Sequence, residues 1–425
     1  MRVVVIGTGY VGLVSGACLA ELGHEVTCVD TDARKIAMLE EGKMPIYEPG
    51  LEVVVKRNVE AGRLHFSTGL EDVAEADVVS IAVGTPSAAD GSVDLQFIYQ
   101  AVRELVCLLK DGSVVALKST VPVGTAREAR LVLGEVGTSA FVVSNPEFLR
   151  EGKAIEDFLR PTRIVLGVDS AEAEAVMLEL YKDVDCPKLV MDSPSAELAK
   201  YASNAFLATK ISFANEMAHL CEELGADVES VTKVMGTDAR IGKDFLRAGP
   251  GWGGGCFPKD VTGLKMLGDS VDHPLPVVSA AIEMNRLARV RVVHRVMKLI
   301  DGIEQPVVAV LGVAFKGDTD DARESPATDI MRLLEENGVI VRAYDPQARV
   351  SEEQHGVRAT QHESPREAAE GAHALLIATE WNEFRDLDLA ALKSVMLGDV
   401  LFDARNMLKQ EIVERSGFRY FRVGR

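Results

Sequence analysis

A glycine-rich stretch around Cys256 combines residue types that can perform covalent chemistry. Residues 249–260 have the sequence GPGWGGGCFPKD. Because glycine has no Cβ, such a backbone can take unusual dihedral angles and wrap closely around a bound molecule. Lys259 is a nearby cation that would favour the thiolate, and Asp260 could accept a proton or hold the lysine in place. The stretch predicts a reactive thiol, against the alternative of an inert buried cysteine.

The other cysteines do not indicate a metal site or disulfides. The chain has six cysteines, none in a CxxC pair or at the spacing of metal ligands, so neither structural zinc nor disulfides are expected. Four of them lie in apolar helix or strand patterns, where a small buried hydrophobic side chain is expected: Cys18, Cys28, Cys107 and Cys221.

Two pairs of polar residues have a spacing that suits catalysis. Residues 145–152 (NPEFLREG) include Glu147 and Glu151. In a helical turn both acids would face one side and could do acid–base work, while a solvated charged turn is the alternative. Lys200 and Asn204 share one face of a predicted helix. They could polarise a substrate oxygen or stabilise an alkoxide, with ordinary surface polarity as the alternative.

The N-terminal segment carries a dinucleotide-binding pattern. Residues 7–12 (GTGYVG) follow a predicted strand and open a predicted helix, and Asp30 closes the next strand. The glycines permit a tight turn and let backbone N–H groups approach a pyrophosphate at the positive end of the helix. Asp30 would accept hydrogen bonds from ribose hydroxyls and repel a 2′-phosphate, which favours NAD over NADP. Arg34 and Lys35 lie close enough to soften that preference.

These segments lie at strand ends of a predicted doubly wound α/β sheet. Thr85 and Thr120 each follow a predicted strand, at the edge where open α/β sheets bind ligands, and are candidate cofactor contacts; turn chemistry is the alternative. After the first βαβ unit, apolar runs separated by helix-like segments occupy residues 78–83, 114–118, 141–143 and 164–168.

The whole chain predicts two Rossmann-like doubly wound domains joined by a long central helix and a small all-α region. Residues 1–192 form the NAD-binding domain, residues 193–300 a central helical dimerisation domain that carries the cysteine loop, and residues 301–425 a second Rossmann-like domain. The last of these repeats the pattern of the first, with Asp345 in the place of Asp30. A long helix between two domains offers a surface for self-association, so we expect a homodimer.

Charge and hydropathy exclude several classes of function. The formal net charge of −19 argues against binding to nucleic acid or to an anionic membrane, because either polyanion would be repelled. No run of apolar residues is long enough to span a bilayer, and the N-terminal segment enters a strand pattern without the design of a signal peptide. We therefore expect a cytoplasmic protein.

The ordered motifs resemble those of the UDP-glucose/GDP-mannose dehydrogenase family, and within it the UDP-glucose 6-dehydrogenases. The resemblance spans nearly the whole chain. It rests on GTGYVG at 7–12, VGTP at 83–86, STVPVGT at 119–125, NPEFLREG at 145–152, the helix segment ELAKYASNAFLATKISFANE, GGGCFPKD at 253–260 and AFKGDTDDARESP at 314–326.

The resemblance implies a reaction in which a sugar CH2OH is oxidised to a carboxylate by two hydride transfers to NAD. It implies that Cys256 adds to the aldehyde and that Lys200, Asn204 and Asp260 surround the reacting carbon, hold a water and stabilise the oxyanion. Asp260 or Lys200 would be the base for the first step. Glu147 would assist hydrolysis of the thioester, through Thr120 and a water.

The resemblance also implies binding residues. Those for NAD are Gly7, Gly9, Tyr10, Val11, Gly12, Asp30, Lys35, Thr85, Thr120, Glu151, Lys259 and Arg323. Those for UDP-glucose are Glu147, Phe148, Leu149, Arg150, Glu151, Lys200, Asn204, Arg240, Phe245, Leu246, Arg247, Ala248, Gly249, Gly253, Phe315, Lys316 and Arg405. Arg240 would reach the active site of the second subunit. No metal is implied.

Two positions depart from the family pattern, and two other functions remain open. Gly255 stands where many relatives have serine, which removes a hydroxyl beside the thiol, and Trp252 replaces the commoner phenylalanine. The same chemistry on GDP-mannose or on an N-acetylated UDP-hexosamine is the nearest alternative. A non-catalytic nucleotide-sugar-binding protein is another, although binding alone requires no thiol.

Overall fold

The computed structural model describes residues 1–88, 90–135 and 137–425 and divides the chain into two compact units. The first comprises Met1–Ser203 and the second Asn204–Arg425. Each contains one α/β sheet. The boundary between them falls inside the long helix α8 (Ser193–Leu224). The predicted division into three domains stays a prediction.

The first unit is built on a sheet with the strand order β3-β2-β1-β4-β5-β6-β7-β8 within the described residues. Its pairs are parallel except β6 with β7, which meet antiparallel at Ser144 and Gly167. The strands are β1 (Arg2–Ile6), β2 (Glu25–Val29), β3 (Leu64–Ser67), β4 (Val78–Ile81), β5 (Val114–Leu117), β6 (Phe141–Ser144), β7 (Ile164–Gly167) and β8 (Lys188–Met191).

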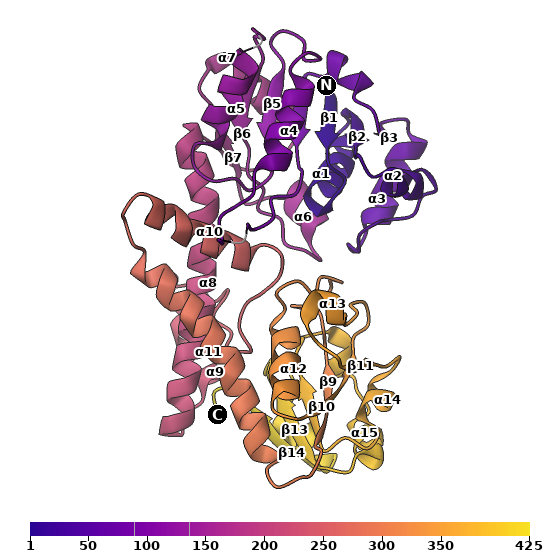
Figure 1. Ribbon diagram of the computed structural model, residues 1–425, viewed down its shortest axis with the longest axis vertical. Helices are drawn as coiled ribbons and strands as arrows, with labels where there is room; N and C mark the ends of the chain where they lie inside the picture. The colour runs from indigo at the N-terminus through magenta and orange to yellow at the C-terminus, as the bar shows by residue number, and fades with distance from the viewer. Residues whose placement is uncertain (89, 136) are drawn as a thin grey trace. The chain divides into compact units, whose positions relative to one another are not determined.

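Helices cover both faces of this sheet, as Figure 1 shows for the indigo-to-magenta part of the chain. They are α1 (Tyr10–Glu21), α2 (Ala33–Glu40), α3 (Leu51–Glu60), η1 (Glu71–Glu75), α4 (Gln96–Leu105), α5 (Thr125–Gly134), α6 (Ala154–Leu159) and α7 (Ala171–Leu180). Because strand side chains alternate between faces, Val3 and Val5 pack into the cluster under α1, whereas Val4 packs with α4 and α5 on the other face. Two-sided burial explains the continuous apolar run of β1.

The second unit contains a smaller sheet, all of whose described pairs are parallel. Its strand order is β11-β10-β9-β12-β13-β14. The strands are β9 (Val307–Leu311), β10 (Ile340–Tyr344), β11 (Thr360–Gln361), β12 (Ala374–Ile377), β13 (Val400–Asp403) and β14 (Arg419–Arg422). The helices around it are α12 (Pro326–Glu336), α13 (Glu352–His355), α14 (Pro365–Ala369), η2 (Asn382–Arg385), α15 (Leu389–Val395) and α16 (Gln410–Arg415).

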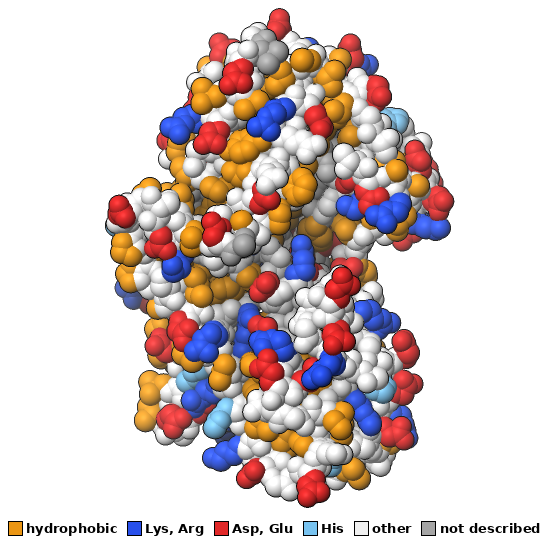
Figure 2. Space-filling model, viewed as in Figure 1, with side chains coloured by type: hydrophobic (Ala, Val, Ile, Leu, Met, Phe, Trp, Pro, Cys, Tyr) orange, Lys and Arg blue, Asp and Glu red, His pale blue; other side chains and the backbone are white. Residues whose placement is uncertain are grey.

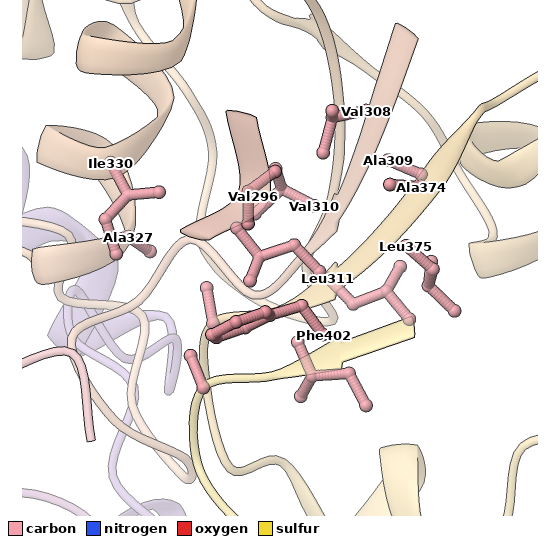
Figure 3. Close-up of a cluster of buried hydrophobic side chains, with 14 of the residues drawn as sticks. Val296, Val308, Ala309, Val310, Leu311, Ala327, Ile330, Ala374, Leu375 and Phe402 are labelled. Atoms are coloured by element: carbon pink, nitrogen blue, oxygen red, sulfur yellow. The ribbon is translucent and has the colours of Figure 1, made fainter. Parts of the chain in front are cut away.

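A continuous apolar core joins this sheet to the helices beside it. Figure 3 shows Val296 of α11 (Pro276–Leu299) and Ile330 of α12 with Leu311 of β9 and Phe402 of β13. All four side chains are at most 2% exposed. The second unit therefore buries its helices and its sheet in one core.

The remaining helices of the second unit are α9 (Val228–Thr237) and α10 (Phe257–Ser270). Helix α8 ends before Gly225, which has a φ of 70°, as expected for a glycine that terminates a helix. The carboxylate of Glu222 on α8 accepts bonds from Arg291 and Arg295 of α11 and from the amide of Gly424. The chain end is thus fixed to both long helices. The predicted fold class is confirmed.

Three of the four cysteines expected to be buried are buried, namely Cys18, Cys28 and Cys221. The prediction for Cys107 is wrong, because it lies just beyond α4 and is exposed. In the described part of the chain no helix is both long and apolar enough to cross a membrane. On the face drawn in Figure 2, Lys and Arg side chains are interspersed with Asp and Glu.

Candidate active site

The β1–α1 loop has the geometry of an anion-binding turn. Gly7 has a φ of 100°, and a Cβ there would lie 2.7 Å from the carbonyl oxygen of Ala82. A Cβ on Gly12 would overlap the carbonyl oxygen of Gly7, whereas one on Gly9 would meet open space among the described atoms. Gly9 precedes α1 without a side-chain cap, and the first turn of α1 holds no acid. The backbone amides in the first turn of α1 are therefore open to an external anion.

Asp30 is held ionised at the end of β2. Its Oδ2 accepts bonds from the amide and the hydroxyl of Thr8, both at 2.8 Å, and its Oδ1 accepts one from the amide of Asp32 at 2.9 Å. Burial acts to raise the pKa of Asp30, but these bonds and the charge of Lys35, 3.7 Å away, together lower it. Arg34 pairs instead with Asp32. An ionised Asp30 suits a free ribose hydroxyl and opposes a 2′-phosphate.

Glu147 and Lys200 form a buried ion pair in the first unit. Glu147 Oε1 lies 3.1 Å from Lys200 Nζ, and each side chain is 5% exposed. Glu147 Oε2 also accepts the amide of Leu149 at 2.5 Å, and Lys200 Nζ lies 5.2 Å from the centroid of the Phe148 ring. The alternative of a solvated charged turn does not hold for Glu147, because its side chain is buried.

The segment that carries Glu147 is not helical. Residues 145–150 form neither helix nor strand, so Glu147 and Glu151 are not related by a helical turn. Arg150 turns to α6, where its guanidinium and amide bind Asp157. The segment is shaped by contacts with other elements and not by its own helical periodicity.

Thr85 and Thr120 follow β4 and β5, which are neighbours in the sheet. Thr85 is buried and Thr120 half-buried. The Ser119 hydroxyl donates to the carbonyl of Val83 at 2.6 Å, which joins the two loops. Both threonines therefore lie at the carboxyl edge of the sheet, as the sequence predicts.

Glu197 of α8 fixes the loop that contains Thr120. Its Oε2 accepts the amide of Gly124 at 2.7 Å, and its Oε1 accepts that of Ala126 at 2.8 Å. These amides belong to the N-terminus of α5, so Glu197 caps that helix from a distant part of the sequence. Burial raises the pKa of Glu197 against the opposing effect of these bonds.

In the second unit, Cys256 is the residue that immediately precedes α10, and it is exposed. A thiol at a helix N-terminus is biased toward the thiolate by the positive end of the helix dipole. The alternative of a buried cysteine is therefore wrong, whereas the reactivity of the Cys256 thiol stays a prediction.

Asp260 lies one turn beyond the cysteine and is 1% exposed. Its Oδ2 accepts the side-chain amide of Asn204 at 2.7 Å, and its Oδ1 accepts Lys259 Nζ at 2.5 Å. The backbone amide of Asp260 donates to the carbonyl of Cys256 at 2.9 Å. One buried carboxylate thus fixes a cation and an amide beside the cysteine turn.

The three glycines before Cys256 pack against residues 315–324. A Cβ on Gly253 would overlap the carbonyl oxygen of Glu324, and one on Gly254, whose φ is 86°, would lie 2.8 Å from the Phe315 ring. The amide of Gly254 also donates to the carbonyl of Arg323 at 3.1 Å. Glycine is needed here for contact between two parts of the protein, a reason that the local sequence did not reveal.

Gly255 has its own reason to lack a side chain. A Cβ at this position would lie 2.5 Å from Arg323 Nη2. Arg323 is in turn paired with Asp321, which also accepts the amide of Gly255 at 3.3 Å. The space that a serine side chain would take is filled here by a guanidinium.

Residues 245–252 are hydrogen-bonded to the long helices α8 and α11. The amide of Gly249 donates to Asn215 of α8 at 2.8 Å, and the amide of Trp252 donates to Asn285 of α11 at 2.7 Å. The indole of Trp252 is buried and lies 6.5 Å from the ring of Phe257, which confirms the expected aromatic packing. Leu246 and Ala248 of this segment are also buried, whereas Arg247 between them is exposed.

Arg405, one of the predicted contacts in the second unit, binds the backbone of Phe315, which is another. Its guanidinium donates to the carbonyls of Phe315 at 2.7 Å and Ala378 at 2.8 Å and lies 3.0 Å from Glu380. Arg240, by contrast, is exposed beyond α9 and pairs with Asp238.

Asp345 occupies the place of Asp30 but has a different use. It is 1% exposed, and it accepts the amides of Val313 and Ala314 and the indole N–H of Trp381 on one oxygen. Its other oxygen accepts the amides of Gln347 and Ala348. Because the protein's own donors surround it, Asp345 cannot serve a ribose as Asp30 can.

Three family models match the chain in order. They are the NAD-binding domain of the UDP-glucose/GDP-mannose dehydrogenase family over residues 1–185, its central domain over 194–287 and its UDP-binding domain over 309–410. The chain belongs to this family. It is therefore an NAD-dependent nucleotide-sugar dehydrogenase.

Individual relatives agree along the whole length. The chain is 46% identical to a UDP-glucose 6-dehydrogenase of Rhizobium meliloti, with both chains fully covered. It is 41% identical to UDP-glucose 6-dehydrogenase TuaD of Bacillus subtilis, covering 100% of this chain and 93% of that one. Among solved structures, a UDP-glucose dehydrogenase from Pyrobaculum islandicum has a TM-score of 0.91 at 39% identity, covering 100% of this chain and 97% of the other.

NAD is the cofactor of this dehydrogenase, and the first unit fits it. The open amides at the start of α1 would hold the pyrophosphate, and the ionised Asp30 would hold the adenosine ribose. The open space at Gly9 permits the close approach that a dinucleotide requires. The contacts of individual residues with NAD stay predictions.

The local sequence did not reveal Glu48 and Glu197. Both are buried glutamates whose carboxylates accept backbone amides from segments far away in the sequence. Glu48 stands in a turn-like YEPG stretch, and Glu197 sits within a helix that was noted for Lys200. A partner more than seventy residues away leaves no periodic signal.

Replacement of Lys200 should separate stability from chemistry. Lys200→Met leaves the Glu147 carboxylate buried without its cation, which should lower the free energy of unfolding by about 3–5 kcal/mol. The double variant Lys200→Met, Glu147→Leu removes both charges and should regain much of that loss, whereas dehydrogenase activity should be lost in both variants. Urea unfolding and rate assays measure the two effects. Recovery of activity in the double variant would contradict a catalytic role for the pair.

Proposed function

We propose that the protein oxidises UDP-glucose to UDP-glucuronate in a four-electron reaction with Cys256 as the nucleophile. The observation that carries this proposal is an exposed thiol at the N-terminus of α10, one turn before a buried Asp260 that holds Lys259 and Asn204. A simple alcohol dehydrogenase has no use for that thiol.

The proposed steps balance as follows. NAD, when bound, accepts one hydride in each of two oxidations. In the first, the C6 alcohol loses a hydride and a proton and becomes an aldehyde. The sulfur of Cys256 bonds to the aldehyde carbon, and its proton ends on the oxygen to give a thiohemiacetal. Loss of a second hydride and a proton gives a thioester, and water cleaves its C–S bond to release the carboxylate, a proton and the thiol.

Lys200 and Asn204 are proposed to stabilise negative charge on the substrate oxygen. They lie one turn apart on α8, so their side chains project from similar positions around the helix. Lys200 Nζ lies 3.1 Å from the Glu147 carboxylate, and a lysine side chain held in this way suits oxyanion stabilisation. We infer that Asp260, the other candidate, is the base in the first step.

Glu147 is proposed to assist hydrolysis of the thioester through Thr120 and a water. Its burial and its contact with the Leu149 amide hold the carboxylate in one orientation. A fixed acceptor can direct the attacking water and take its proton.

Several considerations favour UDP-glucose as the substrate. The C-terminal model is that of a UDP-binding domain, and the relatives at 40–46% identity are named UDP-glucose 6-dehydrogenases. A UDP-D-ManNAc dehydrogenase structure from Pyrococcus horikoshii is 27% identical, with a TM-score of 0.89, and a Pseudomonas aeruginosa GDP-mannose dehydrogenase structure is 28% identical, with a TM-score of 0.56. Residues 245–249, Gly253, Phe315, Lys316 and Arg405 are the proposed contacts of the sugar nucleotide in the second unit.

We also propose a homodimer formed through α8. Phe206, Phe213 and Leu220 are 66%, 44% and 49% exposed, and they repeat every seven residues in the second unit. Seven-residue spacing keeps apolar side chains along one seam of a helix, the pattern by which helices associate. In such a dimer the exposed Arg240 would reach the active site of the second copy.

Replacement of Cys256 tests the covalent chemistry. Cys256→Ala should reduce UDP-glucuronate formation to background, because no thiohemiacetal can form, while NADH still binds in the first unit. Chromatography of the products and NADH fluorescence measure these two properties. Uronate formation by Cys256→Ala at a rate close to that of the wild type would contradict the mechanism.

Charges placed on the α8 seam test the dimer. Phe206→Asp combined with Phe213→Asp should halve the molar mass in light scattering, because burying two carboxylates in an apolar contact is costly. Val53→Asp is the matched control, since Val53 is 65% exposed on α3 of the first unit and is not part of α8. An unchanged mass in the double variant would exclude α8 as the dimer contact.

A further inference from the structure

Glu48 connects segments of the first unit that the sequence places far apart. It lies between α2 and α3 and is 6% exposed. Its Oε1 accepts the amide of Ala154 at 2.8 Å, and its Oε2 accepts the amide of Gly152 at 2.6 Å. The Tyr10 hydroxyl donates to the same Oε2, and it also accepts the amide of Gly152 at 3.2 Å. One carboxylate therefore meets donors from two distant segments.

The two segments belong to the two functional parts of the unit. Tyr10 is the first residue of α1 and follows Gly9 of the dinucleotide loop directly. Gly152 and Ala154 follow the segment that holds Glu147 in its ion pair with Lys200. Glu48 thus links the loop that meets NAD to the segment that carries Glu147.

The acceptor at the centre of this link is a buried carboxylate. Hydrogen bonds to an ionised acceptor are roughly twice as strong as those between neutral groups. Burial and the neighbouring Glu48 raise the pKa of Tyr10 far above its usual range, so the phenol keeps its proton and remains a donor. A buried carboxylate that lost these donors would be left unsatisfied, so movement of either segment is opposed.

We propose that Glu48 is a positioning residue that couples NAD binding at the β1–α1 loop to the order of residues 147–154. When the dinucleotide fixes the start of α1, Tyr10 is fixed with it, and Glu48 transmits that constraint to Gly152 and Ala154. The benefit to catalysis rests on the proposed role of Glu147, whereas the coupling itself does not.

A purely structural role for Glu48 makes a different prediction. Glu48 could simply satisfy the amides at the start of α6, a helix of six residues. In that case its replacement would lower the melting temperature, but the response of residues 147–159 to the dinucleotide would stay as in the wild type. The response to ligand therefore distinguishes the two roles.

Three variants isolate the link. Glu48→Gln keeps the shape of the side chain but places its NH2 group, which cannot accept a hydrogen bond, opposite one of the two backbone amides. Tyr10→Phe leaves both amide bonds of Glu48 in place and removes the bonds of the Tyr10 hydroxyl to Glu48 and to the Gly152 amide, which connect them to α1. Tyr99→Phe is the matched control, because it removes a tyrosine–glutamate bond to Glu128 between α4 and α5.

The experiment is amide hydrogen exchange of peptides covering residues 147–159, measured on the full chain with and without saturating NADH. In the wild type and in Tyr99→Phe, NADH should slow exchange by about tenfold, the effect of one hydrogen bond to a charged group. In Tyr10→Phe and Glu48→Gln, this protection should fall to less than about twofold, and the Kd for NADH should rise severalfold. The double variant Tyr10→Phe, Glu48→Gln should show the same protection and the same Kd for NADH as Glu48→Gln alone.

Wild-type protection in Tyr10→Phe would overturn the proposal, even if Glu48→Gln failed to fold. So would a wild type in which NADH leaves the exchange of residues 147–159 unchanged. Since neither measurement requires sugar oxidation, failure of the Cys256 mechanism would leave this result intact, and failure of the coupling would leave the mechanism intact.

Discussion

A carboxylate removed from water must be surrounded by donors, and the loops of this protein are held by buried carboxylates that meet this requirement. Asp260 gathers Asn204 and Lys259 beside the cysteine turn. Glu147 forms an ion pair with Lys200 and accepts a hydrogen bond from the Leu149 amide. Sheets and helices bring the strand ends together, but these acids determine where the loops between them lie.

The two sheets show how one position can acquire two uses. Asp30 and Asp345 both follow the second strand of a βαβ unit. Asp30 is bound by Thr8 and Asp32 and remains suited to a ribose, whereas Asp345 is enclosed by five donors of the protein itself. The second loop is thereby fixed, and residues 315–324 become a surface against which the glycines before Cys256 pack.

Local patterns predicted the features that depend on local physics. The glycines of residues 7–12, the ending of α8 at Gly225 and the polar strand ends at Thr85 and Thr120 all follow from turn chemistry and periodicity. The order of the motifs along nearly the whole chain predicted the family, which the comparisons confirm.

Long-range contacts could not be predicted in this way. The guanidinium of Arg323 lies over Gly255, and Glu48 matters because of Gly152 and Tyr10. Cys107 was expected to be buried from an apolar run, but the helix before it ends at Leu105. In each case the deciding partner or boundary belongs to the folded chain and leaves no periodic trace in the sequence.

The central claim is that Cys256 allows two successive oxidations at one carbon. The most direct measurement is the number of NADH molecules formed for each UDP-glucose consumed. The sugar products are separated by chromatography and identified by mass spectrometry. The mechanism predicts two NADH and one UDP-glucuronate without free aldehyde, because the intermediates stay on the sulfur. A ratio of one, with the aldehyde accumulating in solution, would contradict it.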